Sequence, residues 1–75
     1  MPSREIKPRK LLRALLKAGF AVKRQRGSHV FIESTRDGEK YATSISLHNK
    51  PMPYGTLRAV LKQSGVSLED LEKLL

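Results

Sequence analysis

Two turn signals divide the middle of the chain and constrain its fold more than any other feature. Arg26-Gly27-Ser28 and Thr35-Arg36-Asp37-Gly38-Glu39 separate short segments in which apolar and polar residues alternate. Glycine adopts positive φ without steric cost, and Asp-Gly between alternating segments is a strong hairpin signal. We therefore predict a meander of three antiparallel strands over Phe20–Gln25, His29–Ser34 and Tyr41–Leu47.

The alternation within these strands predicts which side chains face the core. Phe20 and Val22 are expected to point inward. On the second strand, Val30 and Ile32 share one face, and His29 and Phe31 share the other. The third strand divides in the same way, into Tyr41, Thr43, Ile45 and Leu47 on one face and Ala42, Ser44 and Ser46 on the other.

Helical patterns flank the strands on both sides. Pro8 suits the first position of a helix over Pro8–Ala18, and Gly19 suits its left-handed end. The apolar stripe of this helix is Leu11, Leu12, Leu15 and Leu16. A second helix is expected from Tyr54 to about Ser64, ended by Gly65. Ser67 then caps a short terminal helix whose leucines fold back on the core: Leu68, Leu71, Leu74 and Leu75.

This order predicts an α+β fold with the sequence α-β-β-β-α. The 75 residues allow one domain with a modest core, spanning 1–75. An antiparallel sheet with helices on one face forms a two-layer sandwich and leaves the opposite sheet face open. If Val30 and Ile32 face the helices, His29 points to the open face or its rim.

The charge of the chain is strongly basic and unevenly spread. The formal net charge is +8 and the pI is about 10.3. Nine of the fifteen cations lie in residues 1–26, whereas residues 67–75 are mainly acidic. Such a balance favours nucleic acid over a merely solvated face, and an acidic protein partner is a further possibility. The chain has no cysteine and no apolar run of membrane-spanning length, so we expect a cytoplasmic protein without a membrane anchor.

The motif Gly27-Ser28-His29 places one of only two histidines directly behind the first turn. Histidine has an unperturbed pKa of about 6.5, so it accepts and donates protons near neutrality. Five cations lie nearby in the sequence and suggest a phosphate ester as substrate: Lys17, Lys23, Arg24, Arg26 and Arg36. No two acids stand at ligand spacing beside either histidine. We therefore expect an RNA-cleaving enzyme that uses neither a metal nor another cofactor.

Cleavage of RNA by its own 2′-hydroxyl defines three roles for side chains. A base removes the hydroxyl proton, cations stabilise the charge on the phosphoryl oxygens, and an acid protonates the leaving 5′ oxygen. We assign the base to His29. The expected RNA contacts are Lys23, Arg24, Arg26, Gly27 and Ser28, the last two through backbone amides. Either protonated His48 or water can act as the acid.

Four segments in a fixed order carry a family resemblance over nearly the whole chain. They are Leu15-Leu16-Lys17-Ala18-Gly19-Phe20, Gln25-Arg26-Gly27-Ser28-His29, a strand ending in His48, and the run from Tyr54 to Gly65 with Ser67 and an acidic patch behind it. Together they resemble the HicA toxins, a family of small mRNA interferases also called YcfA-like. One position departs from the family pattern: many relatives have a proline two residues before the later histidine, where this chain has Ser46.

The resemblance implies both a fold and a role. The implied fold is like that of double-stranded-RNA-binding domains. The implied role is a toxin that cleaves mRNA and slows translation until a HicB-type antitoxin binds it. The catalytic histidine of the family is the one in the Gly-Ser-His motif, which is His29 here.

Two other functions compete with the ribonuclease. The first is a non-catalytic domain that binds double-stranded RNA; such domains usually begin their second helix with several lysines, whereas Tyr54-Gly55-Thr56-Leu57-Arg58 holds one cation. The second is a protein that only binds another protein. We expect His48 to be structural or solvent-exposed. Phe31 and Tyr41 are expected to pack against the sheet or core, with Phe31 the better candidate for stacking on a base.

Overall fold

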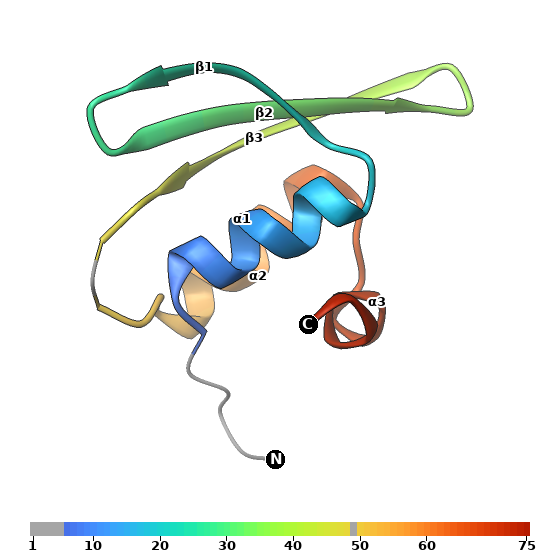
Figure 1. Ribbon diagram of the computed structural model, residues 1–75. Helices are drawn as coiled ribbons and strands as arrows, with labels where there is room; N and C mark the ends of the chain where they lie inside the picture. Colours follow the sequence, from blue (N-terminus) through green and yellow to red (C-terminus); the bar gives the residue numbers. More distant parts are fainter. Residues whose placement is uncertain (1–5, 49) are drawn as a thin grey trace.

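The computed structural model describes residues 6–48 and 50–75, and its elements follow the predicted order (Figure 1). They are α1 (Pro8–Lys17), β1 (Ala21–Arg26), β2 (His29–Arg36), β3 (Glu39–Ser46), α2 (Tyr54–Ser64) and α3 (Leu68–Leu74). The three strands form one antiparallel sheet in the order β1-β2-β3. The predicted α+β class and meander are therefore confirmed. Arg4 of the basic N-terminal region and Asn49 of the loop before α2 lie outside the described residues.

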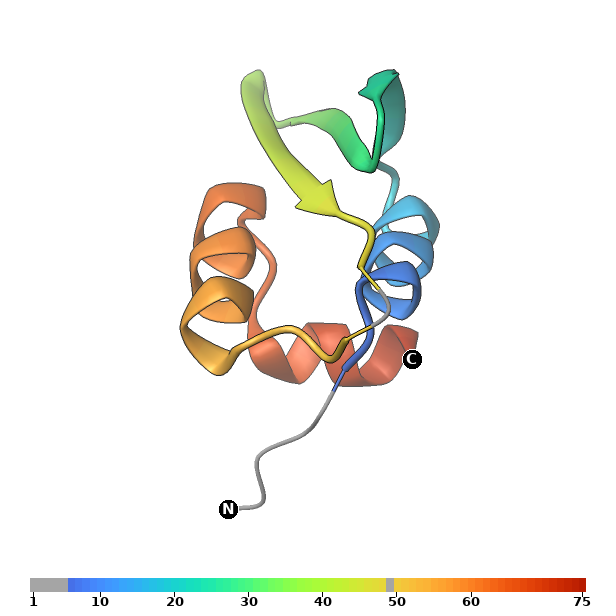
Figure 2. The same ribbon diagram turned by 90° about the vertical axis from the view of Figure 1, so that its left-hand side faces the viewer.

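The helices lie on one side of the sheet (Figures 1 and 2). α1 and α2 pack beneath the strands, and α3 crosses below these two helices, farther from the sheet. In the described part of the chain, no helix covers the opposite side, which we call the outer face. The outer face is therefore the part of the sheet that remains open to a large ligand.

Both hairpins turn over two residues. Asp37 and Gly38 have φ of 52° and 80°, and positive φ at both positions is the type I′ pattern that matches the twist of the strands. Gly27 has φ of 59°, whereas Ser28 is not among the described residues with positive φ, which fits a type II′ turn. Because these turns need only two residues, β2 continues to Arg36 and β3 begins at Glu39. The longer loop predicted over Thr35–Glu39 is wrong.

The core lies between the sheet and the helices. Its most deeply buried apolar side chains are Leu11, Leu15, Ile32, Ile45 and Leu71. Val30 and Phe20 are also buried, as the alternation predicts. Ile6 and Met52 join this core from two segments outside the helices and strands, where the Met52 N–H donates to the Ile6 carbonyl at 2.9 Å. Sequence periodicity does not identify such residues, because neither lies in a periodic segment.

Three side chains that were expected in the core are substantially exposed. Val22 pairs with Ile32 but is 47% exposed, because the helices pack mainly against β3 and leave the β1 edge uncovered. A β-bulge between Val22 and Arg24 also interrupts the alternation of β1. Leu16 and Leu75 are 40% and 50% exposed, since each lies at the margin of its helix stripe. Val22 therefore lies on the inner face of the sheet, as its pairing with Ile32 shows, but it is not buried in the core.

The helix ends follow the sequence signals. Gly65, with φ of 70°, directly follows the last residue of α2. Gly19, with φ of 109°, follows the C-cap residue of α1, Ala18. The Ser67 Oγ atom accepts a hydrogen bond from the Asp70 N–H at 3.0 Å, which is the predicted cap of α3. These ends set the directions in which the chain enters and leaves the helices.

Candidate active site

The register of the sheet places His29 in the centre of a cross-strand row. His29 pairs with Arg26 on β1 and with Ser46 on β3. Directly paired residues on antiparallel strands point to the same face of the sheet. Since Val30, next to His29, is buried beneath the sheet, the row of Arg26, His29 and Ser46 lies on the outer face. His29 is exposed there.

A second row on the same face brings the other arginine close. Phe31, two residues after His29, pairs with Arg24 and with Ser44. The Arg24 Cζ atom lies 4.9 Å from the centroid of the Phe31 ring, which is cation–π geometry. Phe31 is half-buried on this face. Arg24, Arg26 and His29 thus share the outer face of the sheet.

His29 and Ser46 form a particularly close pair. The Leu47 N–H donates to the Ser28 carbonyl at 2.7 Å, one position along from the His29–Ser46 pair. Hydrogen-bonded and non-hydrogen-bonded pairs alternate along an antiparallel ladder, so His29 and Ser46 form a non-hydrogen-bonded pair. Such pairs have Cα atoms about 4.5 Å apart, which brings their side chains close together.

The second histidine of the chain reaches the same end of the sheet. The Nε2 atom of His48 and the Ser46 hydroxyl are hydrogen-bonded at 2.7 Å. His48 is exposed, in agreement with the sequence analysis, but its approach to the His29 row was not predicted. One signal was available: counting back from the two-residue turn at Asp37-Gly38 pairs His29 with Ser46, only two residues before His48.

Lys23 differs from the two arginines because it has a carboxylate partner. Its Nζ atom lies 3.0 Å from the Glu33 carboxylate, and Lys40 reaches the other carboxylate oxygen at 3.3 Å. The hydrogen bond from Lys23 holds the pKa of Glu33 below its ordinary value, against the opposing effect of desolvation and with a further contribution from Lys40. The charge of Lys23 is therefore partly neutralised.

The turn residues Gly27 and Ser28 border His29 at the end of the β1–β2 hairpin. Their carbonyl groups are engaged: Gly27 accepts from the Gln25 side-chain amide at 3.1 Å, and Ser28 accepts from Leu47. These bonds hold the turn against the ends of β1 and β3. These hydrogen bonds therefore fix the backbone of the turn next to His29.

Arg36 lies away from this site. Its guanidinium donates to the Ser64 carbonyl at 2.7 Å and lies 4.5 Å from the centroid of the Tyr41 ring. It is at the opposite end of β2 from His29 and on the opposite face, by the alternation of the strand. Arg36 therefore ties the sheet to the end of α2, and Tyr41 packs against the core as expected.

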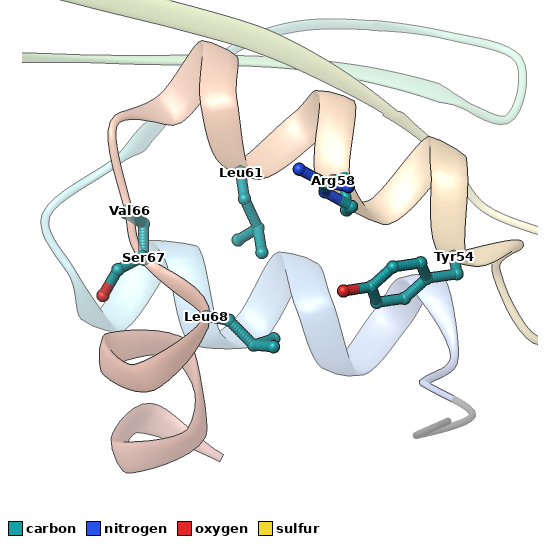
Figure 3. A pocket seen from close by; sticks show the side chains of 6 residues that line it. All are labelled: Tyr54, Arg58, Leu61, Val66, Ser67 and Leu68. Carbon is teal, nitrogen blue, oxygen red and sulfur yellow. The ribbon is translucent and has the colours of Figure 1, made fainter. Parts of the chain in front are cut away.

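Two hollows differ in their chemistry. One of about 220 Å³ lies between α2 and the start of α3 and has no histidine in its lining, which consists of Tyr54, Arg58, Leu61, Val66, Ser67 and Leu68 (Figure 3). The other, of about 370 Å³, is bordered by Ser46 and His48, with Pro8, residues 50–53 and Thr56 completing its wall. Of these two hollows, only the second is lined by a histidine, His48.

Within residues 6–48 and 50–75, no three acidic or histidine side chains are grouped as metal ligands would be. That the activity needs no metal remains a prediction for experiment.

None of the helices in residues 6–48 and 50–75 has the length and apolar character needed to cross a bilayer.

Comparison with protein families gives one match. The family described as the HicA toxin of bacterial toxin–antitoxin systems matches residues 8–66. This span is well over half of the 75 residues and includes the histidine row and His48. No curated protein matches the chain.

Proposed function

The chain belongs to the HicA toxin family, and from this premise we propose that it is an endoribonuclease that cleaves mRNA and thereby inhibits translation. The observation that supports this activity best is the position of His29, exposed on the outer face between Arg26 and Ser46. We propose that it acts in the cytoplasm and that a HicB-type antitoxin neutralises it.

In this proposal His29 is the general base. It takes the proton from a 2′-hydroxyl as that oxygen bonds to the adjacent phosphorus, and the bond from phosphorus to the 5′ oxygen breaks. The 5′ oxygen takes a proton from an acid as it leaves, and the products are a 2′,3′-cyclic phosphate and a 5′-hydroxyl. A positioned base contributes about 10²- to 10⁴-fold to such a reaction. The nucleophile of this step is the 2′-hydroxyl of the substrate, and the roles proposed for side chains include no metal.

Arg24 and Arg26 are proposed to bind the phosphate. Both lie on the outer face with His29, and the planar guanidinium group can hold two phosphate oxygens at once. Lys23 is a weaker phosphate ligand in this proposal, because Glu33 competes for its charge. The backbone amides of Gly27 and Ser28 add donors at the turn.

A substrate with a single altered position tests this proposal. The protein is incubated in chelator with a single-stranded RNA and with the same RNA carrying 2′-deoxyribose at the position that is cut. We expect cleavage of the first, with a 2′,3′-cyclic phosphate end, and no cut at that position in the second. Equal cleavage of both, or cleavage only with added divalent metal, would contradict the proposed chemistry.

The alternative is a non-catalytic domain that binds double-stranded RNA, and the α-β-β-β-α order is compatible with it. The start of α2 argues against it. Arg58 is the one cation there, and its guanidinium lies 6.0 Å from the centroid of the Tyr54 ring. Such domains reach phosphates across a groove, for which this helix start has little charge. This alternative predicts binding of duplex RNA without cleavage.

A further inference from the structure

The proposed cleavage leaves the proton donor to the 5′ oxygen unassigned, and the fold brings a second histidine to the site. His29 and His48 both adjoin one short side chain: Ser46 is the cross-strand partner of His29 and is hydrogen-bonded to the Nε2 atom of His48. In phosphoryl transfer the attacking and leaving oxygens lie roughly in line through the phosphorus. A base and an acid therefore need to stand apart, with room for the phosphate between them.

We propose that His48 and the hollow beside it form a subsite for the leaving nucleotide, in which His48 donates the proton to the 5′ oxygen. The subsite rests on the proposed ribonuclease function. The position of Ser46 is the geometric reason for the assignment, because the serine side chain is small enough for a phosphate to lie above it.

The imidazole rings of His29 and His48 account for both proton transfers of the step. His29 gains the proton of the 2′-hydroxyl as the new oxygen–phosphorus bond forms. The bond between phosphorus and the 5′ oxygen breaks, and that oxygen takes a proton from cationic His48, whose two ring nitrogens both carry hydrogen. Before substrate binds, the Nε2 atom is held by the Ser46 hydroxyl, and the leaving oxygen then replaces this hydroxyl as its partner.

The hollow next to His48 fits the base of the leaving nucleotide. Its volume of about 370 Å³ is within the usual range of small-ligand sites. Pro51, Met52 and Pro53 contribute to its wall, and these apolar groups can lie against the flat face of a base. Lys50 adds an exposed cation at the same wall, where the next phosphate of the RNA would pass.

A sulfur substitution in the substrate tests the acid role of His48. In the modified RNA, sulfur replaces the leaving 5′ oxygen, and a thiolate leaves without needing a proton. We expect His48→Ala to cut the ordinary RNA about 10²-fold or more slowly than the wild type and to recover most of this loss on the sulfur substrate. His29→Ala is expected to lose activity on both substrates.

The outcomes separate the subsite from the proposed function. Equal losses of His48→Ala on the two substrates would overturn the acid role, because a merely structural defect does not depend on the leaving group. If the wild type cuts neither substrate, the ribonuclease proposal fails and the subsite falls with it.

A pair of tryptophan variants tests the hollow. Thr56→Trp fills it from α2, whereas Ala59→Trp adds the same side chain at an exposed position of α2 that does not line it. With Thr56→Trp, we expect KM to rise about tenfold for ordinary RNA but not for RNA lacking the base of the leaving nucleotide. Similar KM values for the two variants on ordinary RNA would overturn the assignment of the hollow.

Discussion

At the residue scale, the direction of His29 depends on the turn that precedes it. Gly27 has φ of 59°, in the region where a side chain strains the backbone. A side chain built at Gly27 has open space around it, so the strain would come from the backbone alone. The turn is therefore sensitive to substitution for a local reason, separate from core packing.

Gly27→Val is expected to reduce cleavage by on the order of 10²-fold, because a small displacement of a catalytic group has a large effect on rate. It should reduce the free energy of unfolding by only about 1–2 kcal/mol. Gly38→Val is the matched control, since Gly38 also has positive φ and open surroundings but lies at the far turn. Cleavage rates and chemical denaturation are measured for both variants. Equal effects of the two on the rate would show that the Gly27 turn does not aim His29.

Some residues of the candidate site can be predicted from the sequence, and others cannot. The Gly-Ser-His motif indicates His29 directly, and the neighbouring arginines follow from the strand register. The bond between Ser46 and His48 does not follow from local pattern, because it depends on where the chain turns after β3 leaves the sheet. Arg36, close to His29 in sequence, is separated from it by the length of β2.

At the element scale, the junction of α2 with the sheet requires Gly65. A Cβ atom there would lie 2.6 Å from the Arg36 guanidinium and 2.7 Å from the Tyr41 ring. The φ of 70° is also unfavourable for any other residue. The end of α2 therefore packs directly against the pair of side chains that reaches it from β2 and β3.

Gly65→Ala is expected to destabilise the protein by about 2 kcal/mol or more, from backbone strain and the displaced contact together. Gly55→Ala is the control: it lies in the first turn of α2, has no positive φ, and a Cβ atom there meets nothing within 4 Å. Its helix propensity gain should stabilise the protein by at most about 1 kcal/mol. Urea denaturation of the two variants should thus shift in opposite directions. A shift in the same direction would contradict the described packing.

The ion pairs of Glu33 connect all three strands on the outer face, through Lys23 on β1 and Lys40 on β3. Because the folded-state pKa of Glu33 is lowered, its contribution to stability is present above the ordinary pKa of a glutamate. It is lost as the pH falls through the lowered value. Glu33→Gln should therefore be less stable than the wild type at pH 7.

This difference should disappear in acid, where the wild-type carboxyl is protonated, and denaturation curves across the acid range measure it. Lys23→Met should weaken the acid dependence more than Lys40→Met does, because the hydrogen bond from Lys23 is the larger cause of the lowered pKa. The reverse order would contradict this account of Glu33.

The elements themselves are largely predictable from the sequence, whereas the coverage of their faces is not. Proline and glycine positions predict the limits of α1 and α2, and Asp37-Gly38 predicts the second hairpin. The exposure of Val22 depends on which strand the helices cover, which is a tertiary property. Alternation alone assigns a side chain to a face of the sheet, but burial requires another element against that face.

At the scale of the whole molecule, two groups of cations lie on opposite sides of the fold. Arg24 and Arg26 lie on the outer face of the sheet, whereas Lys10 and Arg13 border a hollow between α1 and α3, on the helix side. Only the first group adjoins His29. The second adds to the net charge of +8 and so to the long-range attraction of a polyanion, which is RNA in the proposed function.

The salt dependence of RNA affinity distinguishes the contributions of these two groups of cations. If the protein contacts about four to six phosphates of the RNA, the log of the RNA affinity should fall with log salt at a slope of about −3 to −4. Arg24→Ala combined with Arg26→Ala should reduce the size of this slope by about 1.4, and Lys10→Ala combined with Arg13→Ala should leave it nearly unchanged. The affinities are measured in the His29→Ala background so that the RNA stays intact. A slope near zero in that parent would contradict an electrostatic interface.

In the proposed function, His29 performs the chemistry of RNA cleavage on the outer face. The most direct test incubates the purified wild type and its His29→Ala variant with single-stranded mRNA in chelator. We predict cleavage by the wild type alone, with both proteins binding the RNA in a salt-dependent manner. Cleavage by both proteins at equal rates would contradict this role and place the active site away from His29.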